Sequence, residues 1–132
     1  MEHQRVGSGG PWEERVGYSR AVRVGALVFV AGTTAAADGG GAVGGDDAGA
    51  QAREALRRIG LALTQVGAGF DDVVRTRIHV TDIGRWAEVG AAHAEVFGDI
   101  RPAATMVEVS RLIDPALLVE IEVDAVVTEP TR

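Results

Sequence analysis

The chain has 132 residues and a formal net charge of −6, with 46% hydrophobic and 24% charged residues; this fits one globular domain and leaves too little chain for two. It contains no cysteine and no lysine, so all 13 basic residues are arginine. These absences exclude disulfides, thiolate metal ligands and cysteine nucleophiles, and also any chemistry that needs a lysine amine, such as Schiff-base catalysis or the phosphate-binding P-loop. Because acidic residues outnumber arginines, we expect no nucleic-acid partner.

Two glycine-rich segments, residues 7–10 and 39–45, divide the chain. The first predicts a flexible N-terminal arm over residues 1–15, followed by a single domain over 16–128, and the second predicts a flexible loop inside that domain. No apolar segment approaches the roughly 18 residues of a membrane span, and the N-terminus lacks the apolar core of a signal peptide. We therefore expect a cytoplasmic protein without a membrane partner.

The first half of the domain predicts a β-hairpin and a helix. Residues 20–24 and 27–31 are rich in apolar and β-branched side chains and flank a turn at Gly25-Ala26. Asp46 or Asp47 can then cap a helix that Gly67 or Gly69 ends. Its apolar positions follow one helical face, at Ala52, Leu56, Ile59, Leu63 and Val66.

The second half predicts a strand, a helix and two more strands. Residues 73–81 alternate with period two, with Val74, Thr76, Ile78 and Val80 on one face and Arg75, Arg77 and His79 on the other. Asp82 can cap a helix whose apolar stripe is Trp86, Val89, His93 and Phe97. With strands at 103–110 and 117–127, the order predicts an α+β domain, a mixed β-sheet with two helices on one face.

The other face of that sheet would carry charges of both signs, from Arg75, Arg77, His79, Glu108, Glu120, Glu122 and Asp124. Such a face is either solvated or buried against copies of the chain, with arginines paired to carboxylates across a symmetric interface. The pattern alone slightly favours the solvated interpretation. Within this set, Glu120 and Glu122 point the same way and either form ion pairs or include a base that activates water; the pattern favours the ion pairs.

Two other features have a simple structural interpretation. Residues 39–44 match the letters of the dinucleotide motif G-x-G-x-x-G, but Asp38, Asp46 and Asp47 would repel a pyrophosphate, which favours a plain loop. The three histidines lack the spacing of a zinc site, so we expect no metal. We expect His93 to be a hydrogen-bonded packing residue.

Several segments carry a family resemblance when they are taken together and in order. They are Gly17-Tyr18-Ser19-Arg20-Ala21-Val22, Val28-Phe29-Val30-Ala31-Gly32-Thr33, Gln51, Pro102-Ala103-Ala104-Thr105-Met106-Val107-Glu108-Val109, Leu112 and Val119-Glu120-Ile121-Glu122. From about residue 16 to 127 the chain resembles the Rid family of reactive-intermediate deaminases, also called YjgF-like or liver perchloric-acid-soluble proteins. The resemblance implies a chorismate-mutase-like fold, a homotrimer with small-molecule clefts between subunits, and hydrolysis of imines or enamines without metal or cofactor.

The resemblance also implies a set of site residues. Glu120 falls on the carboxylate that activates water, Tyr18 on the aromatic residue at the pocket mouth, and Gly32 beside the strand that lines the cleft. The remaining expected substrate-binding positions are Ala31, Thr33, Gly90, His93, Ala104, Met106 and Arg77.

The chain departs from the family pattern at Ala104, where active members have the arginine that binds the substrate carboxylate. Arg77, Arg75 or Arg101 could supply a substitute. The resemblance thus implies either a divergent imine hydrolase or a ligand-binding protein of the same fold that has lost catalysis. A ribonuclease or translation-inhibitor role is disfavoured by the negative charge.

Overall fold

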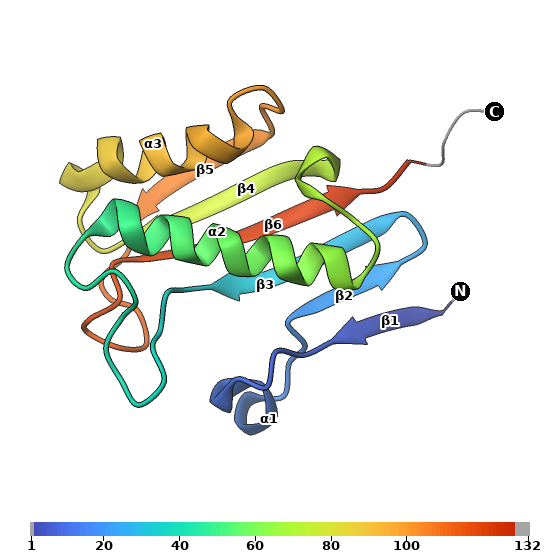
Figure 1. Cartoon of the computed structure of the whole chain (residues 1–132), viewed down its shortest axis with the longest axis horizontal. Helices are drawn as coiled ribbons and strands as arrows, with labels where there is room; N and C mark the ends of the chain where they lie inside the picture. The colour runs from blue at the N-terminus through green and yellow to red at the C-terminus, as the bar shows by residue number, and fades with distance from the viewer. Residues whose placement is uncertain (1, 129–132) are drawn as a thin grey trace.

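The computed structural model describes residues 2–128, in which one six-stranded sheet carries helices on one face (Figure 1). The elements in chain order are β1 (His3–Val6), α1 (Pro11–Val16), β2 (Ala21–Val24), β3 (Leu27–Thr33), α2 (Ala48–Gln65), η1 (Phe70–Asp72), β4 (Val73–Val80), η2 (Ile83–Arg85), α3 (Trp86–Phe97), β5 (Ala103–Glu108) and β6 (Val119–Val126). The strand order is β1-β2-β3-β6-β4-β5, antiparallel except for the parallel pair β4–β5. The predicted single-domain α+β fold is confirmed.

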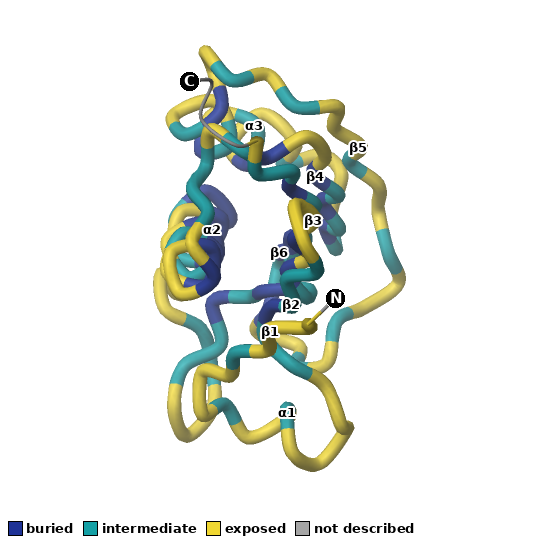
Figure 2. The backbone as a smooth tube through the Cα atoms, turned by 90° about the vertical axis from the view of Figure 1, so that its right-hand side faces the viewer, coloured by how far each residue is buried: buried dark blue, intermediate teal, exposed yellow. Residues whose placement is uncertain are grey.

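Helix α2 supplies most of the helical side of the core. It begins as predicted, because the Asp47 side chain accepts a hydrogen bond from the Ala50 N–H at 3.0 Å. Its apolar face is fully buried against the sheet, and Figure 2 shows the buried residues on the side of α2 that faces the strands. Each buried leucine or isoleucine there stabilises the fold by about 1.5–3 kcal/mol.

Gln51 is a polar residue of α2 that is buried in this core. It is 0% exposed, and its Nε2 donates to the carbonyls of Gly45 at 2.7 Å and Ala116 at 2.9 Å, while its Oε1 accepts from the Leu118 N–H at 2.9 Å. One side chain therefore ties α2 to the glycine-rich loop and to the segment before β6. A buried amide side chain needs hydrogen-bond partners, and these three backbone groups supply them.

The predicted flexible arm is instead folded over most of its length. Residues 3–6 form β1, which pairs with β2 in the register His3↔Val24, and residues 11–16 form α1. Pro11 at the first helical turn and a left-handed Gly17 after the last turn fit the usual ends of a helix. Residues 3–6 are a short segment in which three of the four side chains are polar, and they give no periodic signal, so the pairing with β2 could not be inferred locally.

Three further expectations are wrong in detail. Val74 is 48% exposed because a register shift between Val73 and Arg75 turns it away from the core, and Val73 takes its place. Glu108 lies opposite buried Val80 and accepts from the Ile83 N–H, so it is not part of the charged sheet face. Trp86 is exposed, because Asp82 caps the short helix η2 rather than α3 itself.

None of the helices in residues 2–128 is both long and apolar enough to cross a membrane.

Candidate functional site

The expected site residues lie on the two opposite faces of the sheet. Glu120 pairs with His79 and points to the face without helices, which we call the open face. Ala104 pairs with Thr76, which is fully buried under the helices, so Ala104 belongs to the helical face. Cross-strand partners share a face, and this register therefore separates the two groups within one copy of the chain.

On the open face, Glu120 and Gly32 are in close contact. A Cβ added to Gly32 would lie 2.9 Å from both Cδ and Oε2 of Glu120, closer than any ordinary contact. The approach occurs where the pairing of β3 with β6 shifts between Val30 and Thr33. Within residues 2–128 no cationic side chain forms an ion pair with Glu120.

A shallow pocket of about 350 Å³ adjoins this contact. It is lined by Tyr18, Ser19, Val22, Phe29, Val30, Ala31, Gly32, Glu122 and Asp124. Tyr18, Ala31 and Gly32, three of the expected site residues, thus line one pocket. Thr33 is buried instead, and its Oγ1 donates to the Ala31 carbonyl at 2.7 Å. A hollow of similar size near β1, lined by Glu2, His3, Gln4, Arg23 and Gly25, contains none of the expected site residues.

Arg77 also lies on the open face, where it is held by acidic neighbours. Its Nη1 is 3.2 Å from Oε1 of Glu122 and 3.2 Å from Oδ2 of Asp124. His79 Nε2 lies 3.4 Å from the other oxygen of Glu122. One arginine is therefore shared by two carboxylates within a single chain.

On the helical face, His93 is hydrogen-bonded and packed, as expected. Its Nε2 lies 2.9 Å from the Thr76 Oγ1, and its ring centre is 4.7 Å from that of Phe97. Burial lowers the pKa of His93, so the imidazole is neutral at pH 7. Gly90 is half-buried on the same helix, Met106 packs against the core, and Ala104 is exposed on the edge strand β5.

Of the other suggested substitute cations, Arg101 has a structural role. Its backbone N–H donates to the Phe97 carbonyl at 2.8 Å with a left-handed φ of 54°, and its Nε donates to the Gly98 carbonyl at 3.0 Å. It therefore closes the end of α3 in the position that usually holds glycine. Arg75 is exposed and forms no ion pair among the described residues.

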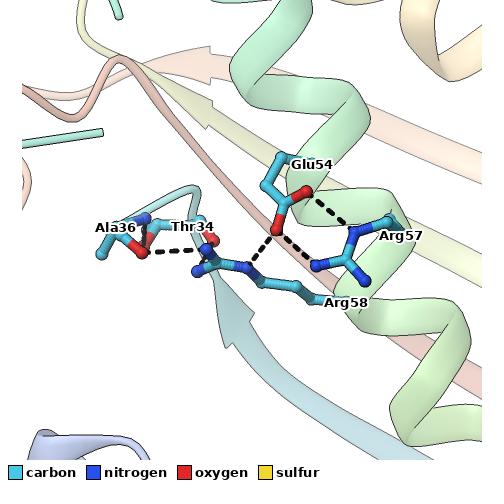
Figure 3. Close-up of polar contacts among 5 residues, drawn as sticks. All are labelled: Thr34, Ala36, Glu54, Arg57 and Arg58. Atoms are coloured by element: carbon cyan, nitrogen blue, oxygen red, sulfur yellow. Dashed lines mark hydrogen bonds and ion pairs between the residues drawn. The ribbon is translucent and has the colours of Figure 1, made fainter. Parts of the chain in front are cut away.

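Residues 34–36 follow β3 at the edge of the pocket. They are bound by side chains of α2 that the sequence reasoning missed. Figure 3 shows Arg58 of α2 donating to the carbonyls of Thr34 and Ala36, both at 2.9 Å. Glu54 accepts from Arg58 at 2.7 Å and from Arg57 at 2.7 and 2.8 Å. The hydrogen bond from Arg57, helped by that from Arg58 and opposed by burial, lowers the pKa of Glu54 from 4.5 to about 2. The i, i+4 spacing of Glu54 and Arg58 was the available signal.

Arg20, which directly precedes β2, was not among the residues expected at the site. Its Nη2 donates to the Gly32 carbonyl at 2.8 Å, and its guanidinium carbon lies 5.5 Å from the centre of the Tyr18 ring. Its Nε is buried and has no hydrogen-bond acceptor among residues 2–128. The Arg20 guanidinium therefore binds the carbonyl of the same glycine that Glu120 contacts.

Comparison with known proteins places this geometry in a family. The endoribonuclease L-PSP family model matches residues 12–127. The crystal structure of Rv2704 from Mycobacterium tuberculosis, described as a member of the YjgF/YER057c/UK114 family, is 60% identical, with a TM-score of 0.87 over 96% of this chain and 100% of that one.

Two curated relatives cover most of both chains. An uncharacterised protein of Streptomyces coelicolor is 40% identical over 92% of this chain and 90% of its own length. The 2-iminobutanoate/2-iminopropanoate deaminase of Salmonella typhimurium is 31% identical over 83% of this chain and 84% of its own. Because both the family model and these relatives span nearly the whole domain, the chain belongs to the Rid family, also called the YjgF or L-PSP family.

Proposed function

We propose that this protein hydrolyses the C=N bond of a small imine, or of an enamine that tautomerises to one, with Glu120 as the base and without metal or cofactor. The observation that carries the proposal is the carboxylate of Glu120, which lies against Gly32 at the edge of a pocket and has no cationic partner among the described residues. An unpaired carboxylate that borders a pocket can position and deprotonate water. The related Salmonella deaminase supports the substrate class.

The reaction needs one water and one proton relay. Glu120 accepts a proton as the water oxygen adds to the imine carbon, and the imine nitrogen takes up a proton to give a carbinolamine. Collapse of that intermediate breaks the C–N bond, releases ammonia and leaves a carbonyl group. Each atom is accounted for by imine plus water giving carbonyl compound plus ammonia, so no redox partner is required.

The complete site, in this proposal, lies between copies of a chorismate-mutase-like homotrimer. Glu120, Gly32 and Tyr18 lie on the open face, whereas Ala104 and His93 lie on the helical face, so one copy cannot supply both groups to one cleft. The open face also exposes apolar side chains that assembly would bury, with Leu27 at 47% and Phe29 at 46% exposure. Sedimentation of the purified chain tests this point, and a monomer would contradict it.

The catalytic proposal is tested by ammonia release from freshly generated imines, both carboxylated and uncharged. We expect Glu120→Gln to abolish release above the spontaneous rate. Glu95→Gln is the matched control, because Glu95 pairs only with the exposed Arg53 on the far side of the helices, a contact of little energetic value. Absence of turnover with every imine would refute the hydrolase.

A second candidate function is ligand binding without catalysis. The observation that favours it is the residue at position 104. The family pattern has an arginine there, whereas this chain has Ala104, a methyl side chain on an exposed edge strand. This candidate predicts that a ligand raises the melting temperature while ammonia release stays at the spontaneous rate. The charge of −6 argues against RNA as that ligand.

A further inference from the structure

Basic residues of β4 lie directly opposite carboxylates of β6 along the open face. The opposed pairs are Arg75 and Asp124, Arg77 and Glu122, and His79 and Glu120. Opposed side chains of an antiparallel pair are close enough to interact, because their Cβ atoms are about 4.5–5.5 Å apart. The first two pairs contain an arginine, whose charge is permanent. The pair that contains Glu120 has a histidine instead, whose charge depends on pH.

The observed contacts follow the diagonals between these pairs and leave Glu120 without a partner. Arg77 Nη1 lies 3.2 Å from Oε1 of Glu122 and 3.2 Å from Oδ2 of Asp124. His79 Nε2 lies 3.4 Å from Oε2 of Glu122, one pair away from its directly opposed residue. Both oxygens of Glu122 are therefore in contact with a basic group, whereas no ion pair among residues 2–128 includes Glu120.

The charged groups that face His79 come from β4 and β6. On β5 the residue opposite His79 is Val107, which carries no charge. On β4 the neighbour on the same face is Arg77, and on β6 the facing residues are Glu120 and Glu122. Two negative charges thus meet one arginine that is already shared with another carboxylate. A second positive charge at His79 would balance this part of the open face.

The two ring nitrogens explain how a proton on His79 would change its contacts. A neutral imidazole has one N–H donor and one acceptor nitrogen, whereas the protonated ring has two donors. A neutral His79 that donates from Nε2 to Glu122 therefore offers only an acceptor to a second carboxylate. A protonated ring offers a second donor, which Glu120 can accept. The side chains of His79 and Glu122 are 28% and 36% exposed, so packing does not lock the ring in one position.

We propose that His79 is a pH-responsive positioning residue for Glu120: the protonated ring bridges Glu122 and Glu120, and the neutral ring binds Glu122 alone. The inference rests on the proposed function and adds its regulation. When His79 is neutral, Glu120 is available to take a proton from water. When His79 is protonated, Glu120 is held in an ion pair and is a weaker base. The switch moves one proton between solvent and the imidazole ring and breaks no other bond.

The sign of the effect follows from the range in which histidine titrates. Histidine takes up its proton between about pH 8 and pH 5, a range in which carboxylates in water remain ionised. Hydrolysis by Glu120 should therefore decline as the pH falls through this range. The decline should disappear when residue 79 cannot change its charge.

The direct test compares the intact protein with His79→Gln, which is always neutral, and His79→Arg, which is always charged. Ammonia release from 2-iminopropanoate is measured from about pH 5.5 to about pH 8. The ratio of variant to intact protein at each pH cancels the pH dependence of the imine itself. We expect kcat/KM of His79→Gln to match the intact protein at the upper end and to exceed it by about two- to fivefold at the lower end, the range typical of a partly exposed ion pair. His79→Arg should match at the lower end and fall about two- to fivefold below at the upper end.

The matched control is His3→Gln. His3 is an exposed histidine on β1, and its Nδ1 lies 3.1 Å from Nη2 of Arg5, away from the open-face pairs. Its ratio to the intact protein should stay near one at every pH. A ratio for His79→Gln that does not vary with pH would overturn the inference and leave the hydrolase standing. Thermal melting checks that the variants fold, and if His79→Arg does not, His79→Gln decides.

A second measurement does not depend on catalysis. The pH titration of the His79 ring is followed by NMR in the intact protein, Glu120→Gln and Glu95→Gln. Loss of one of the two bridged carboxylates should move the change in the ring signals to a pH lower by about 0.3–0.7, which is two- to fivefold in proton affinity, whereas Glu95→Gln should leave it in place. An unmoved titration in Glu120→Gln would overturn the inference even if ammonia is released. A moved titration without ammonia release from any imine supports the coupling of His79 to Glu120 and refutes the hydrolase.

Discussion

Gly32→Ala is the substitution that most directly probes the geometry of the candidate site. The backbone at Gly32 is not left-handed, so alanine meets no conformational barrier there. The added methyl carbon would instead lie 2.9 Å from Cδ and Oε2 of Glu120, whereas ordinary contacts begin at 3.4 Å. The carboxyl group must therefore move by at least about 0.5 Å, which is the difference between these two distances.

We expect Gly32→Ala to lower the activity more than the stability of the protein. Rotating Glu120 away from its preferred conformation costs about 0.5–1.5 kcal/mol, and alanine returns about 0.4–1 kcal/mol by restricting the unfolded chain. The free energy of unfolding should thus change by less than about 1 kcal/mol. Displacing a catalytic group by a fraction of an ångström to 1 Å lowers kcat/KM by about tenfold to a hundredfold.

The measurement combines urea unfolding with ammonia release from 2-iminopropanoate. Gly69→Ala is the matched control, because Gly69 has an extended backbone with φ of −147° and open space where a Cβ would be. The reasoning is refuted if Gly32→Ala retains full activity. A loss of several kcal/mol of stability would also refute it, because it would mean that Glu120 cannot move out of the way.

Three further substitutions test the scaffold of the site. Gln51→Leu should lower the free energy of unfolding by about 3 kcal/mol, since the three hydrogen bonds between Gln51 and backbone groups are lost, and urea unfolding checks this. Asp47→Ala removes the cap of α2 and should cost about 1 kcal/mol by the same measurement, whereas Asp47→Asn should cost much less. Glu54→Gln should cost about 1–2 kcal/mol at pH 7, less than the pKa shift alone implies because Arg57 is largely exposed. The folded-state pKa of Glu54 is lowered, so its contribution is complete above about pH 5 and fades as the pH falls from 4.5 towards 2; equal stability of Glu54→Gln and the intact protein at pH 7 would contradict this.

Periodic patterns in the sequence were sufficient to predict the central elements. The alternation in β4 and β6 and the helical stripe of α2 all reflect a single buried face, which is set by neighbours along the chain. Val74 shows where this reasoning fails, because a register shift in the pairing of β4 with β6 is a property of two strands and leaves no mark on one. The pairing of β1 with β2 at the sheet edge could not be predicted for the same reason.

The site was less accessible to sequence reasoning than the fold. Tyr18, Gly32 and Glu120 were expected at the site because of a family pattern, and in the structure Gly32 contacts Glu120 while Tyr18 lines the adjoining pocket. Arg20 and Arg58 were missed because their partners are backbone carbonyls, which no residue type identifies. An arginine that binds carbonyls has the same sequence signature as one on a solvated surface.

On the open face, charged groups that are paired within one chain can now be distinguished from apolar groups that are exposed. Arg77 binds Glu122 and Asp124 of its own chain, so its charge needs no partner from another copy. What the face leaves unsatisfied is its apolar surface at Leu27 and Phe29, together with the buried N–H of Arg20. Apolar area favours burial by a second copy. Arg20 directly precedes β2, which pairs with β3, so the two features lie near each other at the same part of the sheet. Removing the Arg77 charge should therefore disturb the local ion pairs more than the association of subunits, whereas a polar residue in place of Phe29 should weaken that association directly.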